Sequence, residues 1–281
     1  MTVSELYKKG VDLLKENSVE DAEFECNCLF ERFTGHNRLN RIINPDTDVE
    51  SQKVTDFLNS VNRRLNGEPL QYILGVWEFM GFEFFVGEGV LIPRPETEIL
   101  VEQAIDYIKT HKNAVVYDLC AGSGAIGLSV ARLCPECKVY LFEKYDSALE
   151  YLNKNRDKLN AVNASVIRYD LFDGFDKSIE PPDLILSNPP YVATQEISSL
   201  QREVGYEPET ALDGGEDGLD FYRCICDRWS GYIKHGGEMI MECGEAQSRE
   251  IADMFPKASA IEFIKDFNNI ERVVKIDFNQ E

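Results

Sequence analysis

VVYDLCAGSGAIG, residues 115–127, joins a short apolar strand to a turn that contains three glycines. Gly122, Gly124 and Gly127 have the G-x-G-x-x-G spacing of a nucleotide-binding turn, which lets the backbone approach a ligand closely. The apolar residues on either side predict a strand, a turn and a helix in that order. In an open α/β sheet, ligands bind beyond the carboxyl ends of such strands.

The acid near the end of this strand distinguishes between two classes of ligand. Asp118 would lie beside the pyrophosphate of a dinucleotide, where like charges repel, so an NAD-dependent dehydrogenase is disfavoured. S-adenosylmethionine has no phosphate and carries an ammonium and a sulfonium group, which an acid near the turn stabilises. Residues 118–124 therefore predict an S-adenosylmethionine site that includes Asp118, Gly122 and Gly124.

From residue 114 onward, predicted strands and helices alternate. Strands are expected at 115–119, 139–143, 164–169, 184–187 and 238–243, and helices near 124–134, 146–159, 218–234 and 245–255. This alternation predicts a parallel sheet with helices on both faces. Two late strands, 259–265 and 272–278, are joined by so few residues that they must be antiparallel. An α/β sheet with an antiparallel final strand is the pattern of class I, Rossmann-like, S-adenosylmethionine-dependent methyltransferases.

The chain before this sheet predicts two further regions. Residues 1–66 carry apolar residues at helical spacing and are expected to form a small helical domain. Residues 67–92 are rich in aromatic residues and glycine and alternate in places, which predicts a β-hairpin linking two domains. The methyltransferase domain would then span residues 93–281 and begin with a helix through Ile99–Ile108, which Pro95 precedes.

Two more acids are expected at the same edge of the sheet. Glu143 ends the second predicted strand, where an acid accepts hydrogen bonds from ribose hydroxyls. Asp170 ends the third strand and could accept from an adenine amino group, with Leu171 or Phe172 against the ring. Alternatively, Glu143 is a solvated acid at a strand end, and Asp170 caps a turn or a helix.

The fourth strand ends in Ser187-Asn-Pro-Pro-Tyr191, a stiff way to leave a strand. Prolines fix φ and have no N–H, so Pro189 and Pro190 present carbonyls on a rigid loop, and the Asn188 amide oxygen is one more acceptor. Converging acceptors suit a planar NH2 group conjugated to a carbonyl or an aromatic ring, whose lone pair they direct at a methyl group. Tyr191 could cover such a flat substrate. A helix-avoiding turn would explain the prolines alone.

Composition limits the partners that such a protein can have. Acids outnumber bases 50 to 29 and the formal net charge is −21, which argues against a dedicated nucleic-acid binder. The N-terminus has no signal-peptide pattern and no apolar run is long enough to span a membrane, so a cytoplasmic protein is expected. Cys134 and Cys137 have metal-ligand spacing, but no second pair or clustered histidines accompany them, so no metal site is expected.

Five segments together resemble the release factor glutamine methyltransferases of the HemK/PrmC type. They are GEPLQYILGVWEFMGFEF (67–84), VLIPRPETEILVE (90–102), DLCAGSGAIG (118–127), SNPPY (187–191) and YEPETALDGGEDGLDFY (206–222). The resemblance covers nearly the whole chain. It implies N5-methylation of the glutamine in the GGQ motif of peptide chain release factors, with S-adenosylmethionine as the methyl donor and S-adenosylhomocysteine as the product.

The resemblance also implies roles for individual residues. Asn188 and the Pro189 carbonyl would hold the glutamine amide, and Pro190 and Tyr191 would complete the pocket. The cofactor would contact Arg94, Glu96, Thr97, Cys120, Ala121, Gly122, Ser123, Gly124, Glu143, Asp170, Leu171 and Asn188. The helical domain would bind the release factor, and the enzyme would act as a monomer without a membrane or nucleic-acid partner.

Two residues depart from the family pattern. Cys120 stands where relatives usually have glycine, and Glu143 where they often have aspartate; we expect Cys120 to avoid a positive φ. The stretch 193–220, with eight acids and one base, suggests an acidic surface for a basic partner. The alternative functions are an N6-adenine methyltransferase acting on nucleic acid, which the N-P-P-Y motif alone would allow, and a scaffold that binds a partner without catalysis.

Overall fold

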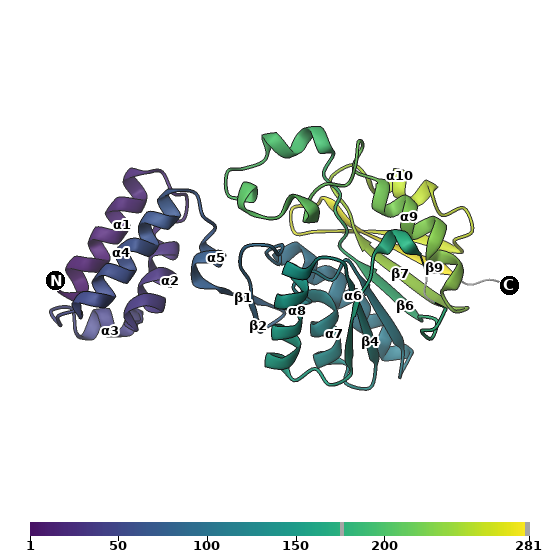
Figure 1. Cartoon of the computed structure of the whole chain (residues 1–281), viewed down its shortest axis with the longest axis horizontal. Helices are drawn as coiled ribbons and strands as arrows, with labels where there is room; N and C mark the ends of the chain where they lie inside the picture. Colours follow the sequence, from purple (N-terminus) through teal and green to yellow (C-terminus); the bar gives the residue numbers. More distant parts are fainter. Residues whose placement is uncertain (175–176, 279–281) are drawn as a thin grey trace. The chain divides into compact units, whose positions relative to one another are not determined.

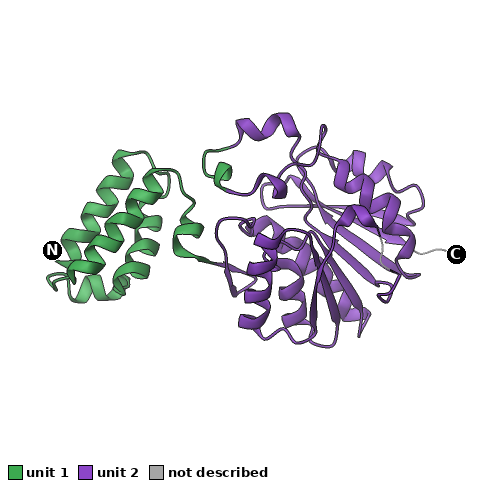
Figure 2. Cartoon of the chain, viewed as in Figure 1, with its two compact units in different colours: residues 1–76, 201–206 green, residues 77–200, 207–281 purple. Residues whose placement is uncertain are grey.

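The computed structural model describes residues 1–174 and 177–278 and divides the chain into two compact units (Figure 2). Unit 1 contains residues 1–76 and the short segment 201–206, and unit 2 contains residues 77–200 and the chain from residue 207 onward. The sequence predicted that the helical domain ends at residue 66. The unit instead extends to Val76 and includes a segment from the second half of the chain, which no local pattern indicates.

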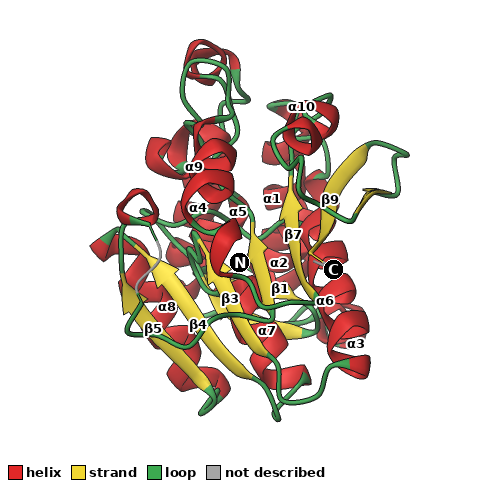
Figure 3. Cartoon of the chain, turned by 90° about the vertical axis from the view of Figure 1, so that its right-hand side faces the viewer, coloured by secondary structure: helices red, strands yellow, loops and turns green. Residues whose placement is uncertain are grey.

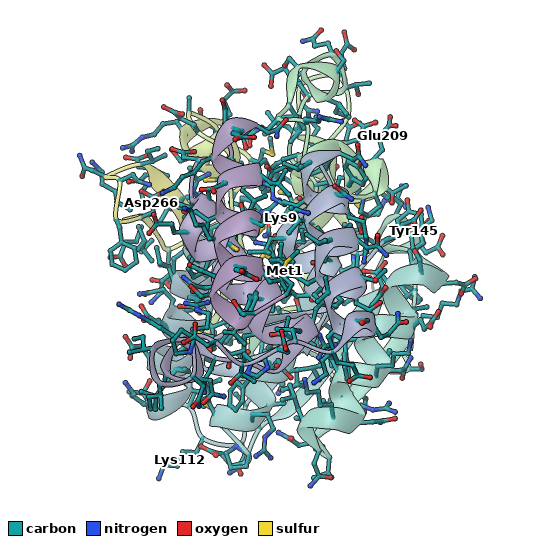
Figure 4. All side chains as sticks on the ribbon, turned by 90° about the vertical axis from the view of Figure 1, so that its left-hand side faces the viewer. Met1, Lys9, Lys112, Tyr145, Glu209 and Asp266 are labelled. Carbon is teal, nitrogen blue, oxygen red and sulfur yellow. The ribbon has the colours of Figure 1, made fainter. Side chains whose placement is uncertain are left out.

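Unit 1 is a bundle of amphipathic helices whose apolar stripes face one another. The helices are α1 (Val3–Glu16), α2 (Ala22–Thr34), α3 (Arg38–Ile43), α4 (Ser51–Leu65) and α5 (Leu70–Leu74). Leu6 of α1, Phe30 of α2 and Phe57 of α4 are fully buried, and the two phenylalanine rings meet edge to face with centroids 5.1 Å apart. Most charged residues lie outside this core, as Lys9 does on the outer face of α1 (Figure 4), and the buried Arg64 is paired with Glu25.

The segment 67–92, predicted as a β-hairpin, forms a hairpin only in part. Its first half contains the helix α5, which ends at Gly75 because that residue adopts the left-handed conformation with a φ of 74°. The strands β1 (Val76–Phe79) and β2 (Phe82–Phe85) then pair as a separate two-stranded sheet. Residues 86–94 are turns and irregular backbone.

Unit 2 is built on one seven-stranded sheet (Figures 1 and 3). Its strands are β3 (Val115–Leu119), β4 (Lys138–Glu143), β5 (Ala164–Arg168), β6 (Leu184–Ser187), β7 (Gly237–Glu242), β8 (Ala260–Lys265) and β9 (Glu271–Phe278), in the order β5-β4-β3-β6-β7-β9-β8. Neighbouring strands are parallel except at β9, which runs antiparallel to β7 and β8. The predicted α/β class and the antiparallel final strand are therefore confirmed.

Helices cover both faces of this sheet. The first face carries α6 (Glu98–Thr110), α7 (Ala125–Leu133) and α8 (Asp146–Leu159), and the second carries α9 (Asp220–Arg228) and α10 (Ser248–Asp253). Side chains alternate between the faces, since Val116 and Leu186 join the core beneath α6 and α7, whereas Tyr117 and Ile185 join the core beneath α9. This alternation decides where each polar residue near a strand end points.

The structure also bears on membrane-spanning segments and on metal sites. Within the described ranges, no helix is both long enough and apolar enough to cross a bilayer. The side chains of those residues also include no group of three or more His, Cys, Asp or Glu arranged to hold a metal ion. Cys134 and Cys137 form a turn after α7, in which the Cys137 amide donates to the Cys134 carbonyl at 3.1 Å, and all eight cysteines are free thiols.

Candidate active site

A cleft that is partly open to solvent lies at the carboxyl ends of the central strands of unit 2. The predicted site residues that line it are Arg94, Thr97, Cys120, Ala121, Gly122, Ser123, Glu143, Asp170, Leu171, Asn188 and Pro190. The predicted site residues outside the lining are Asp118, Gly124, Glu96, Pro189 and Tyr191. Lining residues that sequence reasoning missed include Val90, Pro93, Phe142, Tyr145, Tyr169, Pro208, Thr210 and Phe221. Most of these are apolar or aromatic. Five of them, Val90, Pro93, Pro208, Thr210 and Phe221, lie in the segments that carry the family resemblance, which assigned them no role.

Cys120 begins the glycine-rich turn and adopts a φ of 62°, in the left-handed region. The prediction that a cysteine would avoid a positive φ here is wrong. The chain reverses sharply, with the Ala121 amide donating to the Phe142 carbonyl at 3.0 Å and the Gly124 amide donating to the Ala121 carbonyl at 2.7 Å. These hydrogen bonds hold the turn closed and offset the cost of left-handed backbone at Cys120, roughly 1–2 kcal/mol.

Asp118 lies beneath the turn and not in the cleft. It points to the α7 face of the sheet together with Val116, because alternate residues of β3 share a face. Its side chain is fully buried, and its Oδ2 accepts a hydrogen bond from the Gly127 amide at 2.8 Å. Burial raises the pKa of Asp118 to about 7, although the Gly127 bond opposes the rise. A Cβ at residue 127 would lie 2.8 Å from the same oxygen, so the third glycine of the motif makes room for this carboxyl group.

Glu143 ties the end of β4 to the glycine-rich turn. Its carboxylate accepts from the Gly122 amide at 2.8 Å, and from the amides of Lys144 and Tyr145 at 2.8 and 2.9 Å. One oxygen takes two bonds and the other takes one, which leaves acceptor capacity toward the cleft that Glu143 lines. The residue therefore braces the turn and can still accept from ligand hydroxyls.

Asp170 caps a short turn at the end of β5. Its Oδ1 accepts from the Phe172 amide at 3.0 Å, and its Oδ2 pairs with Lys144 Nζ at 2.8 Å. Although burial opposes ionisation, these bonds lower the pKa of Asp170. The residue also lines the cleft beside Leu171. The capping role is present in the structure, and the contact with an adenine amino group stays a prediction.

The polar groups around the turn fit a cationic ligand better than a phosphate. The amides of Gly122 and Gly127, which could otherwise bind a phosphate, already donate to the carboxyl groups of Glu143 and Asp118. A pyrophosphate at this turn would therefore meet the Glu143 carboxylate and would find the Gly122 and Gly127 amides already bonded. The residues present fit S-adenosylmethionine and disfavour a dinucleotide.

The loop after β6 carries Asn188 into the cleft. Ser187 Oγ donates to the Leu119 carbonyl at 2.8 Å, which ties the ends of β6 and β3 together. Asn188 follows Leu186 on the α6 face of the sheet, and its Nδ2 donates to Thr97 Oγ1 at 3.4 Å. Its Oδ1 is therefore the end of the carboxamide that is left to accept from a ligand.

Side-chain bonds hold the two prolines of this loop still. Gln247 Nε2 donates to the Tyr191 carbonyl at 3.0 Å, and its Oε1 accepts from the Gly244 amide at 2.9 Å. Pro189 and Pro190 are buried, and among the residues that the structure describes no hydrogen bond is directed to the Pro189 carbonyl. That carbonyl is a rigid acceptor that a ligand can use.

Glu242 is a buried acid next to this loop that sequence reasoning missed. It ends β7, is 2% exposed, and accepts from Thr97 Oγ1 at 2.6 Å and from the Tyr191 hydroxyl at 3.4 Å. Burial raises the pKa of Glu242 to about 7, although the Thr97 bond and the charge of Arg272 oppose the rise. Its place at the carboxyl end of a strand was the signal that could have found it.

Arg94 lines the cleft and is held by a buried carboxylate. Glu207, whose side chain is 2% exposed, pairs with the Arg94 guanidinium and accepts from the Ile92 amide at 2.9 Å. Pro208 and Thr210, just beyond it, also line the cleft, so the ion pair fastens the segment before α6 to the loop after β6. Sequence reasoning counted Glu207 only as part of an acidic surface, and its burial removes it from that surface.

A solved structure and two family models match this chain. The hMettl16 catalytic domain, solved in complex with an RNA hairpin, is 13% identical with a TM-score of 0.59, and the match covers 83% of this chain and 86% of that chain. A likeness at this identity shows the fold alone. A model described as methyltransferase small domain matches residues 96–212, and one described as PrmC N-terminal domain matches residues 5–75. The fold and the cleft define a class I, S-adenosylmethionine-dependent methyltransferase.

Relatives narrow this class to one family. The chain is 39% identical over 232 residues to the release factor glutamine methyltransferase of Thermodesulfovibrio yellowstonii, a match that covers 81% of this chain and 82% of that protein. It is 35% identical over 280 residues to the enzyme of the same name from Clostridium acetobutylicum, with 98% of each chain covered. The chain belongs to the release factor glutamine methyltransferase family, and the resemblance seen in its sequence is confirmed.

Proposed function

We propose that the protein transfers a methyl group from S-adenosylmethionine to the side-chain amide nitrogen, N5, of the glutamine in the GGQ motif of a peptide chain release factor. The observation that carries the proposal is Asn188, which lines the cofactor cleft with its Nδ2 bonded to Thr97 and its Oδ1 left to accept. The carbonyl of Pro189, which lies between the lining residues Asn188 and Pro190, would be the second acceptor. The names of the relatives support the substrate class.

The two acceptors address the main difficulty of the reaction. An amide nitrogen is a poor nucleophile, because its lone pair is delocalised into the carbonyl group. S-adenosylmethionine supplies an activated methyl group when it is bound. Asn188 and Pro189 would accept from the two N–H bonds of the amide, aim the nitrogen lone pair at the methyl group, and stabilise positive charge as it develops on nitrogen. As the N–CH3 bond forms and the S–CH3 bond breaks, the amide nitrogen releases one proton to solvent. Neither acceptor has to take up that proton, so both work through position.

Different residues of the cleft would contact different parts of the cofactor. Glu143 would accept from the ribose hydroxyls and Asp170 from the adenine amino group, with Leu171 against the ring. The residues Arg94, Thr97, Cys120, Ala121, Gly122, Ser123 and Asn188 would contact the remainder. Asp118 and Gly124 do not line the cleft and would act by holding the glycine-rich turn in shape. Glu96, which also lies outside the lining, would act from behind the cofactor-binding residues.

We also propose that residues 1–66 bind the release factor, that the enzyme acts as a cytoplasmic monomer, and that S-adenosylhomocysteine leaves as the product. The acidic stretch 193–220 offers a basic factor less than its sequence suggested. Four of its eight acids are already paired, namely Glu203 with Arg64, Glu207 with Arg94, and Asp217 and Asp220 with Arg223. The unpaired negative charge that residues 193–220 could offer to a basic partner is therefore smaller than the sequence suggests.

The function is tested with purified protein and labelled S-adenosylmethionine. Three acceptors are compared, namely a GGQ-containing release factor, the same factor with the glutamine changed to alanine, and duplex DNA. We expect label on the unaltered factor alone. Label on DNA would favour the N6-adenine reaction, and equal label on the altered factor would exclude the glutamine as the target.

The Asn188→Ala variant tests the amide acceptor directly. We expect transfer to fall by about 100-fold or more, while the dissociation constant for S-adenosylmethionine stays within about threefold of its wild-type value. Asn153→Ala on α8, whose residue does not line the cleft, is the matched control. Near-normal turnover of Asn188→Ala would refute the role of the carboxamide.

A further inference from the structure

Glu242 lies where two parts of the site meet, and the transfer step described above does not use it. The strands β6 and β7 are neighbours, with Ser187 beside Met241, so Glu242 lies next to the start of the N-P-P-Y loop. Its two oxygens accept from different elements, Oε2 from Thr97 at 2.6 Å and Oε1 from the Tyr191 hydroxyl at 3.4 Å. A carboxyl group this deeply buried is costly unless it is paired, so both contacts matter to it.

Ionised Glu242 sets the direction of the hydrogen bonds between it and Asn188. In that state the carboxylate only accepts, so the Thr97 hydroxyl donates its single proton to Glu242 Oε2. Thr97 Oγ1 can then only accept, and it accepts from Asn188 Nδ2 at 3.4 Å. The NH2 end of the Asn188 carboxamide is thereby held against Thr97, and the oxygen end is left for the cleft.

This orientation matters because the two ends of a carboxamide have the same shape and opposite hydrogen-bonding character. With Oδ1 toward the cleft, Asn188 accepts from an NH2 group of the substrate. After a half-turn of the carboxamide, its own NH2 group would face that NH2 group and no bond could form. Shape alone does not choose between the two states, so a hydrogen-bonding partner of defined polarity must do so.

We propose that Glu242 is a positioning residue that acts through Thr97 to hold the Asn188 carboxamide with its oxygen toward the cleft, and that this polarity selects a substrate amide over a carboxylate. The inference rests on the proposed function, since only a substrate with an NH2 group needs an acceptor at Asn188. The site would therefore bind glutamine and reject glutamate. The bond to the Tyr191 hydroxyl fastens the far side of the same loop to the same carboxylate.

Charged and polar groups from four elements face Glu242. Arg272 of β9 supplies a positive charge that favours the ionised carboxylate, and Glu96, before α6, supplies an opposing negative charge. Tyr191 donates from the loop after β6, and Tyr222 of α9 donates to the Glu242 backbone carbonyl at 2.7 Å. Arg272 is held in turn by Asp266 at 3.2 Å. The surroundings support a carboxylate that accepts from both Thr97 and Tyr191.

The test uses the full-length protein, a GGQ-containing release factor and labelled S-adenosylmethionine. Thr97→Val removes the hydroxyl and keeps the branched shape, and Glu242→Gln replaces one acceptor oxygen with a donor. Both variants should lower kcat by about 10- to 100-fold, and Thr97→Ser should recover most of what Thr97→Val loses. Glu238→Gln is the matched control, because Glu238 is a partly buried acid at the opposite end of β7.

A release factor with glutamate in place of the GGQ glutamine can be tested as an inhibitor. A packing defect alone would not make it bind more tightly. In the wild-type protein, Asn188 Oδ1 and the Pro189 carbonyl repel its carboxylate, so it should compete weakly. In Thr97→Val and Glu242→Gln, the Asn188 carboxamide can turn its NH2 group toward the cleft. The inhibition constant of the glutamate factor should then fall by about tenfold.

Two results would overturn the positioning role. One is turnover of Thr97→Val equal to that of the wild type, and the other is an inhibition constant of the glutamate factor that is unchanged in both variants. Thermal unfolding identifies a variant that fails to fold, and the remaining variant then decides. A wild-type protein that does not methylate the factor would refute the proposed function itself, so the two failures are distinguishable.

Discussion

Glu207→Ala should destabilise unit 2 and weaken its cofactor cleft at the same time. Ile92 is 1% exposed, so removing the carboxylate leaves its buried amide without an acceptor, at a cost of about 1–3 kcal/mol. The Arg94 side chain is 35% exposed and regains water, so loss of the ion pair adds about 1 kcal/mol or less. Together the two losses should lower the free energy of unfolding by about 1–4 kcal/mol.

Glu207→Gln separates the two contributions. Its amide oxygen can still accept from the Ile92 amide, whereas the charge that faces Arg94 is lost, so we expect a loss of about 1 kcal/mol. Trp77 and Trp229 are the two tryptophans of the chain and both belong to unit 2, so urea denaturation followed by tryptophan fluorescence reports on that unit.

The control for this pair is Glu209→Ala, which removes an exposed acid two residues along and should change stability by less than about 0.5 kcal/mol. Because Arg94 and Pro208 line the cleft, Glu207→Ala should also raise the dissociation constant for S-adenosylmethionine by about tenfold, as measured by calorimetry. Equal destabilisation by alanine and glutamine would refute the argument from the Ile92 amide. If Glu207→Ala left the affinity for S-adenosylmethionine unchanged, the argument that Glu207 positions residues of the cleft would be refuted.

Two further predictions concern buried carboxyl groups on the α6 and α7 face of the sheet. Gly127→Ala should lower the free energy of unfolding, measured by urea denaturation, by about 1–3 kcal/mol, because the new Cβ would lie 2.8 Å from Asp118 Oδ2. The control is Gly231→Ala, whose Cβ would have no neighbour within 4 Å. An equal loss in the two variants would contradict the argument. Burial raises the pKa of Glu242 from 4.5 to about 7, so the unfolded chain releases this proton at lower pH than the folded protein, and the wild type loses stability as pH rises through that window. Between about pH 5 and pH 8, Glu242→Gln should lose about 2–3 kcal/mol less stability than the wild type. If the free energies of unfolding of Glu242→Gln and the wild type changed with pH in parallel, the effect would be excluded.

The sheet of unit 2 could be predicted from the sequence because its signals are local. Strands such as β3 and β6 are short apolar runs bounded by turn residues, and the structure places them within a residue or two of the expected ranges. The short link between β8 and β9 dictates their antiparallel pairing on steric grounds. The polar residues at these strand ends were likewise predictable, since Glu143 is the last residue of β4 and Asn188 follows β6 directly.

The contacts that organise the site could not be predicted in the same way. Thr97 and Glu242 are 145 residues apart in the chain, and Arg94 and Glu207 are 113 apart, so only the strand order and the return of a loop bring them together. At Cys120, two backbone hydrogen bonds outweigh the preference of a non-glycine residue for negative φ.

The short segment 201–206 has a consequence for how the two units can be separated or exchanged. Within unit 1, Arg64 pairs with both Glu25 and Glu203, and the Tyr206 hydroxyl donates to the Asn66 carbonyl at 3.0 Å. Neither unit is therefore encoded by one continuous stretch of the gene. A protein truncated to begin at residue 77 would retain 201–206 without the helices that hold it. A chimaera that takes its helical unit from a relative would have to replace residues 1–76 and the segment 201–206 together.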